Sequence, residues 1–287
     1  MKVRAFPVLA ASAVTAVAAA LALTLPANAE GAEGAVVPAG AKYVALGSSF
    51  AAGPGILPTE SGSPAGCARS THNYANQIAT ALSLTLVDAT CSGATTANVL
   101  TTAQNGVAPQ INAVTADTQL VTMTIGGNDV NYLGSIGTFS CQDSGGTNCG
   151  TVDEQAITTG LTTVGSRIAD VIEAVHTRAP QAKVVVVDYQ TILPTSGPLC
   201  DGVPLSDAHA AFERNLRDQL DAATVTAAAE HNATLVDVAS ASADHNACAA
   251  DPWIEKYVVA SGKTAYHPML SGMTNVAGLV VDELRTS

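Results

Sequence analysis

Five short apolar runs, rich in β-branched residues, constrain the fold more than any other feature of this chain. Longer segments with helical periodicity separate them. Strands that are apolar on both faces and alternate with helices indicate a parallel sheet covered by helices on both sides, and therefore an α/β fold. The five runs are residues 43–46, 84–88, 120–125, 183–188 and 234–238.

Three segments between and after these runs have the pattern of helices. Thr151 and Glu154 have the spacing of a capping box, and the apolar stripe that follows continues until Pro180. Residues 207–231 predict a second helix, and residues 271–284 predict a last one. The helices needed to cover a parallel sheet are therefore present.

Glycine-rich or polar segments follow the first three strands. The first strand ends at Gly-Ser-Ser (47–49), the second at Cys-Ser-Gly (91–93) and the third at Gly-Gly-Asn-Asp (126–129), while Ala-Tyr-His-Pro (265–268) lies near the carboxyl terminus. Functional sites of such sheets gather at the carboxyl ends of the strands. We expect these four segments to lie along one edge of the sheet.

A serine at a strand-to-helix turn can be a nucleophile if a base takes its proton and N–H donors stabilise an oxyanion. His267 is the best candidate base, because Pro268 restricts the backbone after it and a helix begins nearby. Gly93 could offer its backbone N–H, and Asn128 its side-chain N–H. The other histidines fall in surface helices or polar loops: His72, His176, His209, His231 and His245.

Together these segments resemble a known family. "YVALGSSFAAGPG", "CSGATT", "TIGGNDV" and "YHPMLSGM" are similar to the four blocks of the SGNH, or GDSL, hydrolases, and closest to the secreted lipases and esterases of actinomycetes. The resemblance implies a three-layer α/β/α sandwich with a flavodoxin-like five-stranded parallel sheet. It also implies Ser49 as nucleophile, His267 as base, an oxyanion hole made by Ser49, Gly93 and Asn128, and no metal or organic cofactor.

The sequence departs from the family pattern at two structural positions. Ser48 stands where the family has Asp, and the position within the block selects Ser49 as nucleophile with Ser48 supporting the loop. Met269 replaces the usual Asn after His-Pro, so Ser271 could cap the following helix instead.

A third departure concerns the acid of the catalytic triad. Thr264 stands three residues before His267, where the family commonly has Asp. The resemblance therefore implies a Ser-His dyad in which the backbone carbonyl of Thr264 orients the imidazole. Asp251 is the alternative acid.

The six cysteines predict disulfides rather than a metal site. Their number is even, and they form no Cys-x-x-Cys. A thiol- or metal-dependent enzyme would need a free cysteine or clustered ligands. Of the 15 arrangements open to six cysteines, we expect the sequential one, because no loop then crosses another: Cys67–Cys91, Cys141–Cys149 and Cys200–Cys248.

The first 29 residues have the pattern of a secretory signal peptide. Lys2 and Arg4 precede an apolar run over residues 8–25, and Ala-Asn-Ala at 27–29 offers a cleavage site before Glu30. An uncleaved amino-terminal anchor is the alternative, because the apolar run approaches the length that spans a bilayer.

After processing we expect a flexible lead-in over residues 30–40 and one hydrolase domain over residues 41–287. This product would be secreted, either free or associated with the cell envelope, without a stable membrane span. The chain has 12 basic and 24 acidic residues, a formal charge of −12. Such a surface repels phosphate backbones, so nucleic acid is excluded as a partner. We expect a monomer, since no apolar surface helix demands a partner.

The predicted function is hydrolysis of carboxylic esters through an acyl-enzyme. Loops at 53–66 and 132–150 are expected to line the acyl pocket. Aromatic residues make up only 4% of the chain, which favours lipid or simple acyl esters over acetylated polysaccharide. A polysaccharide deacetylase and a catalytically inactive cell-envelope binding module are the alternatives.

Overall fold

Five parallel strands form one sheet in the order β2-β1-β3-β4-β5. The computed structural model describes residues 1–3 and 37–286, so the predicted signal peptide beyond residue 3 lies outside the described residues. The sheet confirms the predicted α/β fold. Its strands are β1 (Lys42–Gly47), β2 (Thr85–Asp88), β3 (Thr118–Thr124), β4 (Lys183–Val187) and β5 (Thr234–Val236).

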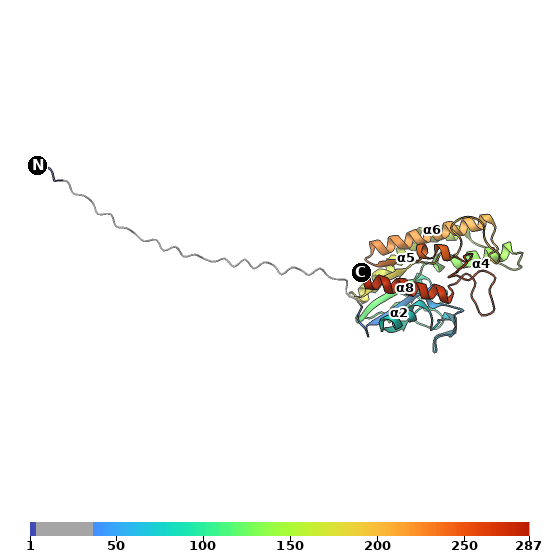
Figure 1. Ribbon diagram of the computed structural model, residues 1–287, viewed down its shortest axis with the longest axis horizontal. Coiled ribbons are helices and arrows are strands. Elements are labelled where there is room, and N and C mark those ends of the chain that lie inside the picture. The colour runs from blue at the N-terminus through green and yellow to red at the C-terminus, as the bar shows by residue number, and fades with distance from the viewer. Residues whose placement is uncertain (4–36, 287) are drawn as a thin grey trace. The chain divides into compact units, whose positions relative to one another are not determined.

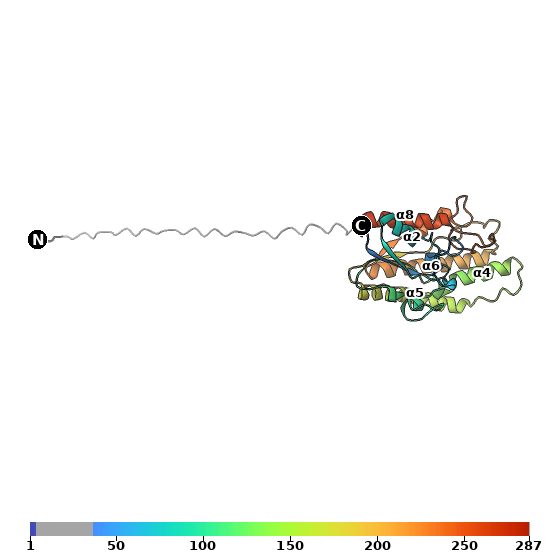
Figure 2. The ribbon, with the colours of Figure 1, turned by 90° about the horizontal axis from the view of Figure 1, so that it is seen from below.

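Helices cover both faces of the sheet, which gives the expected three layers (Figures 1 and 2). The helices α2 and α8 pack against each other on one face, and α5 and α6 pack against each other on the opposite face. These four helices are α2 (Tyr74–Leu82), α5 (Glu154–Arg178), α6 (Asp207–Glu230) and α8 (Leu270–Thr286). The shorter ones are α1 (Ser49–Ala52), α3 (Thr96–Leu100), α4 (Tyr132–Asp143) and α7 (Val238–Ala241), with 3₁₀ turns η1 (Ala65–Cys67), η2 (Gln110–Ala113), η3 (Asn128–Val130) and η4 (Ala243–His245).

Each strand supplies side chains to two separate cores, because successive residues of a strand point to opposite faces. In β1, Tyr43 and Ala45 belong to the core beneath α2 and α8, whereas Val44 and Leu46 belong to the core beneath α5 and α6. All four side chains are fully buried. Burial on both faces explains why the strands are continuously apolar.

Three disulfides join the cysteines in the predicted sequential order: Cys67–Cys91, Cys141–Cys149 and Cys200–Cys248. No helix among the described residues is long and apolar enough to cross a membrane.

Two predicted helix caps are wrong. Asp153, not Thr151, caps α5, because its carboxylate accepts a hydrogen bond from the backbone N–H of Ala156 (2.9 Å). Ser271 lies inside α8, and its hydroxyl donates to the carbonyl of Pro252 (3.1 Å). A side chain can cap a helix only at the residue just before the first helical turn, where it accepts a free backbone N–H. Neither Thr151 nor Ser271 occupies that position.

One segment predicted to be a loop contains a helix, and part of the predicted flexible lead-in is packed and hydrogen-bonded. The expected loop over residues 132–150 contains the twelve-residue helix α4, whose glycines and serines weaken its apolar periodicity. In the predicted lead-in, Val37 is buried in the core beneath α8, and the backbone N–H of Gly40 donates to the carbonyl of Ser83 (2.8 Å). The prediction of a flexible lead-in over residues 30–40 is therefore wrong for residues 37–40.

Candidate active site

Ser49 begins the short helix α1 directly after β1, and its Oγ lies 2.8 Å from Nε2 of His267. The turn between β1 and α1 depends on Gly47, whose φ is 131°. A Cβ at this position would lie 2.5 Å from the carbonyl oxygen of Thr124 in the neighbouring strand. Glycine therefore allows β1 to end against β3 and to turn at once into the helix that carries the serine.

The imidazole of His267 is held in one orientation by a backbone carbonyl. Nδ1 lies 2.7 Å from the carbonyl oxygen of Ala265, so Nδ1 carries the hydrogen and Nε2 is left to accept the proton of the Ser49 hydroxyl. Burial lowers the pKa of His267, and the bond to Ala265 opposes this only partly. The neutral imidazole, which is the form that acts as a base, is thereby favoured.

Both predicted partners of His267 Nδ1 are wrong. The carbonyl of Thr264 accepts the backbone N–H of His267 (3.3 Å) instead. The side chain of Asp251 is 83% exposed, and its carboxylate lies 3.7 Å from Nδ1 of a different histidine, His245. The positive φ of Tyr266 (57°) turns the backbone just before the histidine, so that the carbonyl two residues upstream is the one within reach.

The second and third glycine-rich segments contact each other. One N–H of the Asn128 side-chain amide donates to the carbonyl of Ala94 (2.8 Å), which leaves its other N–H for a ligand. Gly93 adopts a φ of 79°, where a side chain would be strained. Among the described residues, no hydrogen-bond acceptor is found for the backbone N–H of Ser49 or Gly93. These three groups are the expected oxyanion donors.

Tyr189, which the sequence reasoning did not identify, connects the first and third segments. Its hydroxyl accepts the backbone N–H of Gly127 (3.0 Å) and lies 3.2 Å from Ser48 Oγ. Burial raises the pKa of Tyr189 to about 12, so the hydroxyl stays protonated and can donate to Ser48. Its ring lies 4.9 Å from the ring of Phe50. The sequence feature that could have indicated Tyr189 is its position two residues after β4, at the same edge of the sheet.

Two further buried side chains that the sequence reasoning missed position the backbone of the site. The Asp129 carboxylate accepts from the backbone N–H (3.0 Å) and the hydroxyl (2.6 Å) of Thr96, and so joins the Asn128 turn to the segment after Gly93. The Gln110 side-chain amide forms two hydrogen bonds with the backbone of Gly47, at 2.8 and 3.0 Å.

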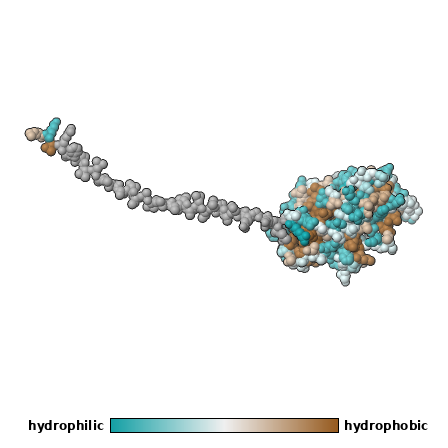
Figure 3. Space-filling view, in the orientation of Figure 1, coloured by the Kyte–Doolittle hydropathy of each residue, from teal (hydrophilic) through white to brown (hydrophobic). Residues whose placement is uncertain are grey.

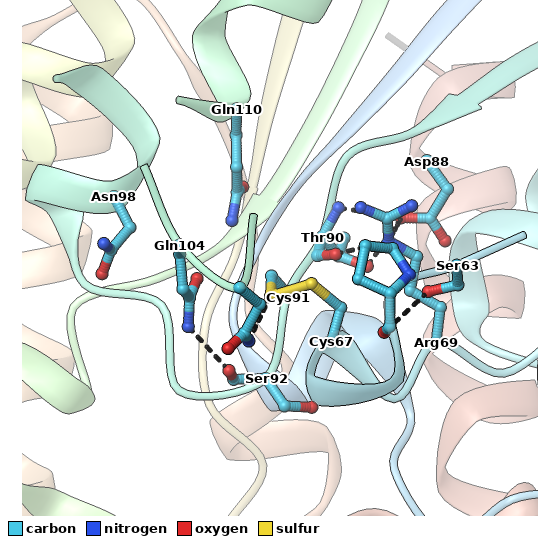
Figure 4. Close-up of a disulfide and its surroundings, with 12 residues drawn as sticks. Ser63, Cys67, Arg69, Asp88, Thr90, Cys91, Ser92, Asn98, Gln104 and Gln110 are labelled. Atoms are coloured by element: carbon cyan, nitrogen blue, oxygen red, sulfur yellow. Dashed lines mark hydrogen bonds and ion pairs between the residues drawn. A yellow bond between two sulfur atoms is a disulfide. The ribbon is translucent and has the colours of Figure 1, made fainter. Parts of the chain in front are cut away.

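The disulfide Cys67–Cys91 fixes the segment that carries Gly93 (Figure 4). Nε2 of Gln104 donates to the carbonyl of Ser92 (2.9 Å), between the disulfide and the glycine. Nε of Arg69 donates to the carbonyl of Thr90 (2.6 Å) on the other side of Cys91.

Among residues 1–3 and 37–286 no group of three or more His, Cys, Asp or Glu side chains is arranged to hold a metal ion.

A serine paired with an imidazole lies at the carboxyl edge of a five-stranded parallel sheet, as expected for an SGNH-type hydrolase. Residues 45–274 match the model of the GDSL-like lipase/acylhydrolase family. The chain belongs to this family and is a carboxylic ester hydrolase.

Relatives and solved structures agree with this assignment. Lipase 2 of Streptomyces coelicolor is 35% identical over 257 residues, which cover 84% of this chain and 85% of the relative. A lipase of Streptomyces rimosus is 33% identical over 81% of this chain and 82% of its own length. The crystal structure of phospholipase A1 from Streptomyces albidoflavus superposes with a TM-score of 0.70 at 28% identity, covering 86% of this chain and all of that one. The extracellular lipase of Streptomyces rimosus gives a TM-score of 0.67 at 29% identity, covering 85% and 98%.

Proposed function

We propose that this protein is a secreted esterase or lipase that hydrolyses lipid or acyl esters through an acyl-enzyme on Ser49. The observation that carries the proposal is the 2.8 Å contact between Ser49 Oγ and His267 Nε2, with the opposite ring nitrogen bound to a carbonyl. This arrangement leaves a hydroxyl in contact with an unprotonated base, which is what a serine nucleophile requires.

In the proposed reaction, His267 takes the proton of Ser49 as Oγ attacks the ester carbonyl. The N–H groups of Ser49, Gly93 and Asn128 then stabilise the negative charge on the carbonyl oxygen. His267 returns the proton to the leaving alcohol, which departs. Water, deprotonated by the same imidazole, hydrolyses the acyl-enzyme and frees Ser49.

Two observations support the finer parts of the proposal. The similar proteins are described as lipases and as a phospholipase A1, which favours fatty acyl esters over acetylated sugars. Three disulfides suit an oxidising compartment outside the cytosol, and the Streptomyces rimosus neighbour is described as extracellular.

The test is hydrolysis of p-nitrophenyl esters from acetate to palmitate by the processed chain and by two single variants. Ser49→Ala removes the proposed nucleophile. Ser48→Ala is the matched control, because it removes a buried hydroxyl one residue earlier. We expect the Ser49 variant to be inactive on every ester and the Ser48 variant to keep most of its turnover.

Equal activity of Ser49→Ala and the parent would refute the assigned nucleophile. A parent that is inert on every ester would instead favour the binding-module alternative. The chain length of fastest turnover then separates a lipase from an acetyl esterase.

A further inference from the structure

Phe50, the residue after the proposed nucleophile, packs its ring against the proposed base. The centroid of its ring lies 5.5 Å from the centroid of the His267 imidazole, and the two ring planes are tilted by 42°. Aromatic rings in contact prefer tilted or offset arrangements with centroids about 4.5 to 7 Å apart. Hydrophobic areas reach the surface among hydrophilic ones on one face of the domain (Figure 3). Phe50 adds almost nothing to the surface, because it is 3% exposed and belongs to the core beneath α5 and α6.

A second ring contact fixes the position of Phe50. Its centroid lies 4.9 Å from the centroid of the Tyr189 ring, at an interplanar angle of 58°. Tyr189 is itself held at its hydroxyl, which accepts the backbone N–H of Gly127 (3.0 Å) and lies 3.2 Å from Ser48 Oγ. A movement of Phe50 away from the imidazole would leave a gap beside Tyr189, which a close-packed interior resists.

The hydrogen bonds of the imidazole restrain only its two nitrogens. Nδ1 lies 2.7 Å from the carbonyl oxygen of Ala265, and Nε2 lies 2.8 Å from Ser49 Oγ. Both bonds leave the ring plane from its edge. Phe50 fills space beside the imidazole that water would otherwise enter, and its ring offers water no polar atom. The ring contact therefore adds a restraint and a barrier to water that the hydrogen bonds do not supply.

The electrostatic surroundings of His267 agree with exclusion of water. Burial lowers the pKa of His267, its hydrogen bond to a backbone carbonyl opposes this, and no charged side chain of the described residues contributes to the shift. Glu255, whose backbone N–H donates to the carbonyl of His267 (2.9 Å), has its carboxylate 3.6 Å from Nζ of Lys263. Two buried tyrosines nearby, Tyr189 and Tyr266, stay protonated because burial raises their pKa.

We propose that Phe50 is a positioning residue for ester hydrolysis, which holds the His267 imidazole against Ser49 and keeps water away from it. This inference rests on the proposed function and deepens it. Phe50 acts through the imidazole and not on the ester. A base shielded in this way stays unprotonated at a lower pH than a hydrated histidine does, and its Nε2 stays within reach of the serine hydroxyl.

The pH dependence of kcat/KM on dissolved p-nitrophenyl butyrate tests the proposal with Phe50→Leu, which stays apolar but is smaller and not aromatic. We expect the midpoint to rise toward the ordinary 6.5 of histidine, because water then reaches the imidazole. We also expect kcat to fall by about tenfold with little change in KM, because the base is less well placed. Phe50→Met, which keeps more of the volume, should change both quantities in the same direction and serves if the leucine variant does not fold.

Phe139→Leu is the matched control, because it makes the same substitution beside a different histidine. Phe139 is 4% exposed, and its ring stacks on His209 with the centroids 3.8 Å apart. We expect this variant to lower the urea midpoint of unfolding, as loss of a buried ring does, and to leave the pH midpoint of kcat/KM where it is in the parent.

Titration of His267 by NMR gives a second measurement that does not depend on turnover. The Ser49→Ala protein is compared with the Ser49→Ala, Phe50→Leu double variant, and His267→Gln identifies the signal of the imidazole. We expect the titration midpoint of His267 to be higher in the double variant.

The proposal is overturned if the midpoint in Phe50→Leu equals that of the parent, or if Phe139→Leu shifts it as much. A lower midpoint in Phe50→Leu would also overturn it, since the ring would then stabilise the imidazolium through its π face and not exclude water. Failure of the proposed function gives a different result: the intact protein would leave the ester unhydrolysed, while the NMR titration would still show whether Phe50 shields His267.

Discussion

Glu213 in α6 is a buried carboxyl group, and its replacement by Gln should change how stability depends on pH. The residue is 1% exposed, and neither carboxyl oxygen has a hydrogen-bond partner among the described residues. The nearby hydroxyl of Ser135 donates instead to the carbonyl of Tyr132 (3.0 Å). Burial raises the pKa of Glu213 from an ordinary 4.5 to about 8, so the folded protein holds this group protonated at neutral pH.

The sign of the effect follows from proton binding. Between pH 4.5 and about 8 the folded state binds a proton that the unfolded state has released. The free energy of unfolding therefore falls as pH rises, by about 1.4 kcal/mol per pH unit from this group. Over the whole window the loss is at most about 5 kcal/mol. Gln has nearly the same shape and no charge, so Glu213→Gln should match the parent near pH 4 and exceed its stability increasingly up to pH 8.

Urea unfolding at pH 5 and pH 8 measures this difference. Asp188, whose pKa burial also raises to about 8, is present in both proteins, so its contribution largely cancels. Glu230→Gln, at the exposed end of the same helix, is the matched control and should leave the pH dependence as it is. Equal losses of stability between pH 5 and pH 8 in the parent and in Glu213→Gln would refute the reasoning.

Three further predictions concern the site itself. Asn128→Ala should lower kcat by about 10² to 10³ with little change in KM, since an oxyanion donor acts mainly in the transition state; steady-state kinetics on a soluble ester measure it, and full activity would exclude the donor role. Tyr189→Phe should destabilise the fold by about 1 to 3 kcal/mol, because the buried N–H of Gly127 loses its acceptor; an unchanged urea midpoint would contradict this. Because burial lowers the pKa of His267, kcat/KM should rise with pH at a midpoint below the ordinary 6.5, and a midpoint above that value would count against His267 as a buried base.

The sheet was predictable because its strands are buried on both faces and so read as continuous apolar runs. The run at 43–46 is β1 with one residue missing at each end, and the run at 234–238 continues past β5 because Val238 begins α7. The helix α4 was not predictable, since Gly134, Gly137 and several hydroxyl residues interrupt its apolar stripe. Its stability comes from tertiary contacts that a local pattern does not contain.

The contact between Ser49 and His267 followed from the four sequence blocks, although the two residues are 218 positions apart. The residues that position the serine and the histidine could not be predicted from these blocks. Tyr189 and Ser48 are 141 positions apart, and no local pattern pairs them. The choice of Ala265 over Thr264 depends on the positive φ of Tyr266. Such a backbone angle at a tyrosine is rare and has no sequence signature.

The hydrogen bond from His267 Nδ1 is accepted by a main-chain oxygen. The group that orients the proposed base therefore cannot be removed by a single side-chain substitution. A carboxylate can be deleted by changing one codon, and loss of the orienting aspartate is severe in enzymes that rely on it. Every amino acid at position 265 brings the same carbonyl. Saturation mutagenesis should therefore find two intolerant side chains in the proton-transfer chain where a triad enzyme has three. Only changes that displace the backbone around residue 266 could remove the third partner.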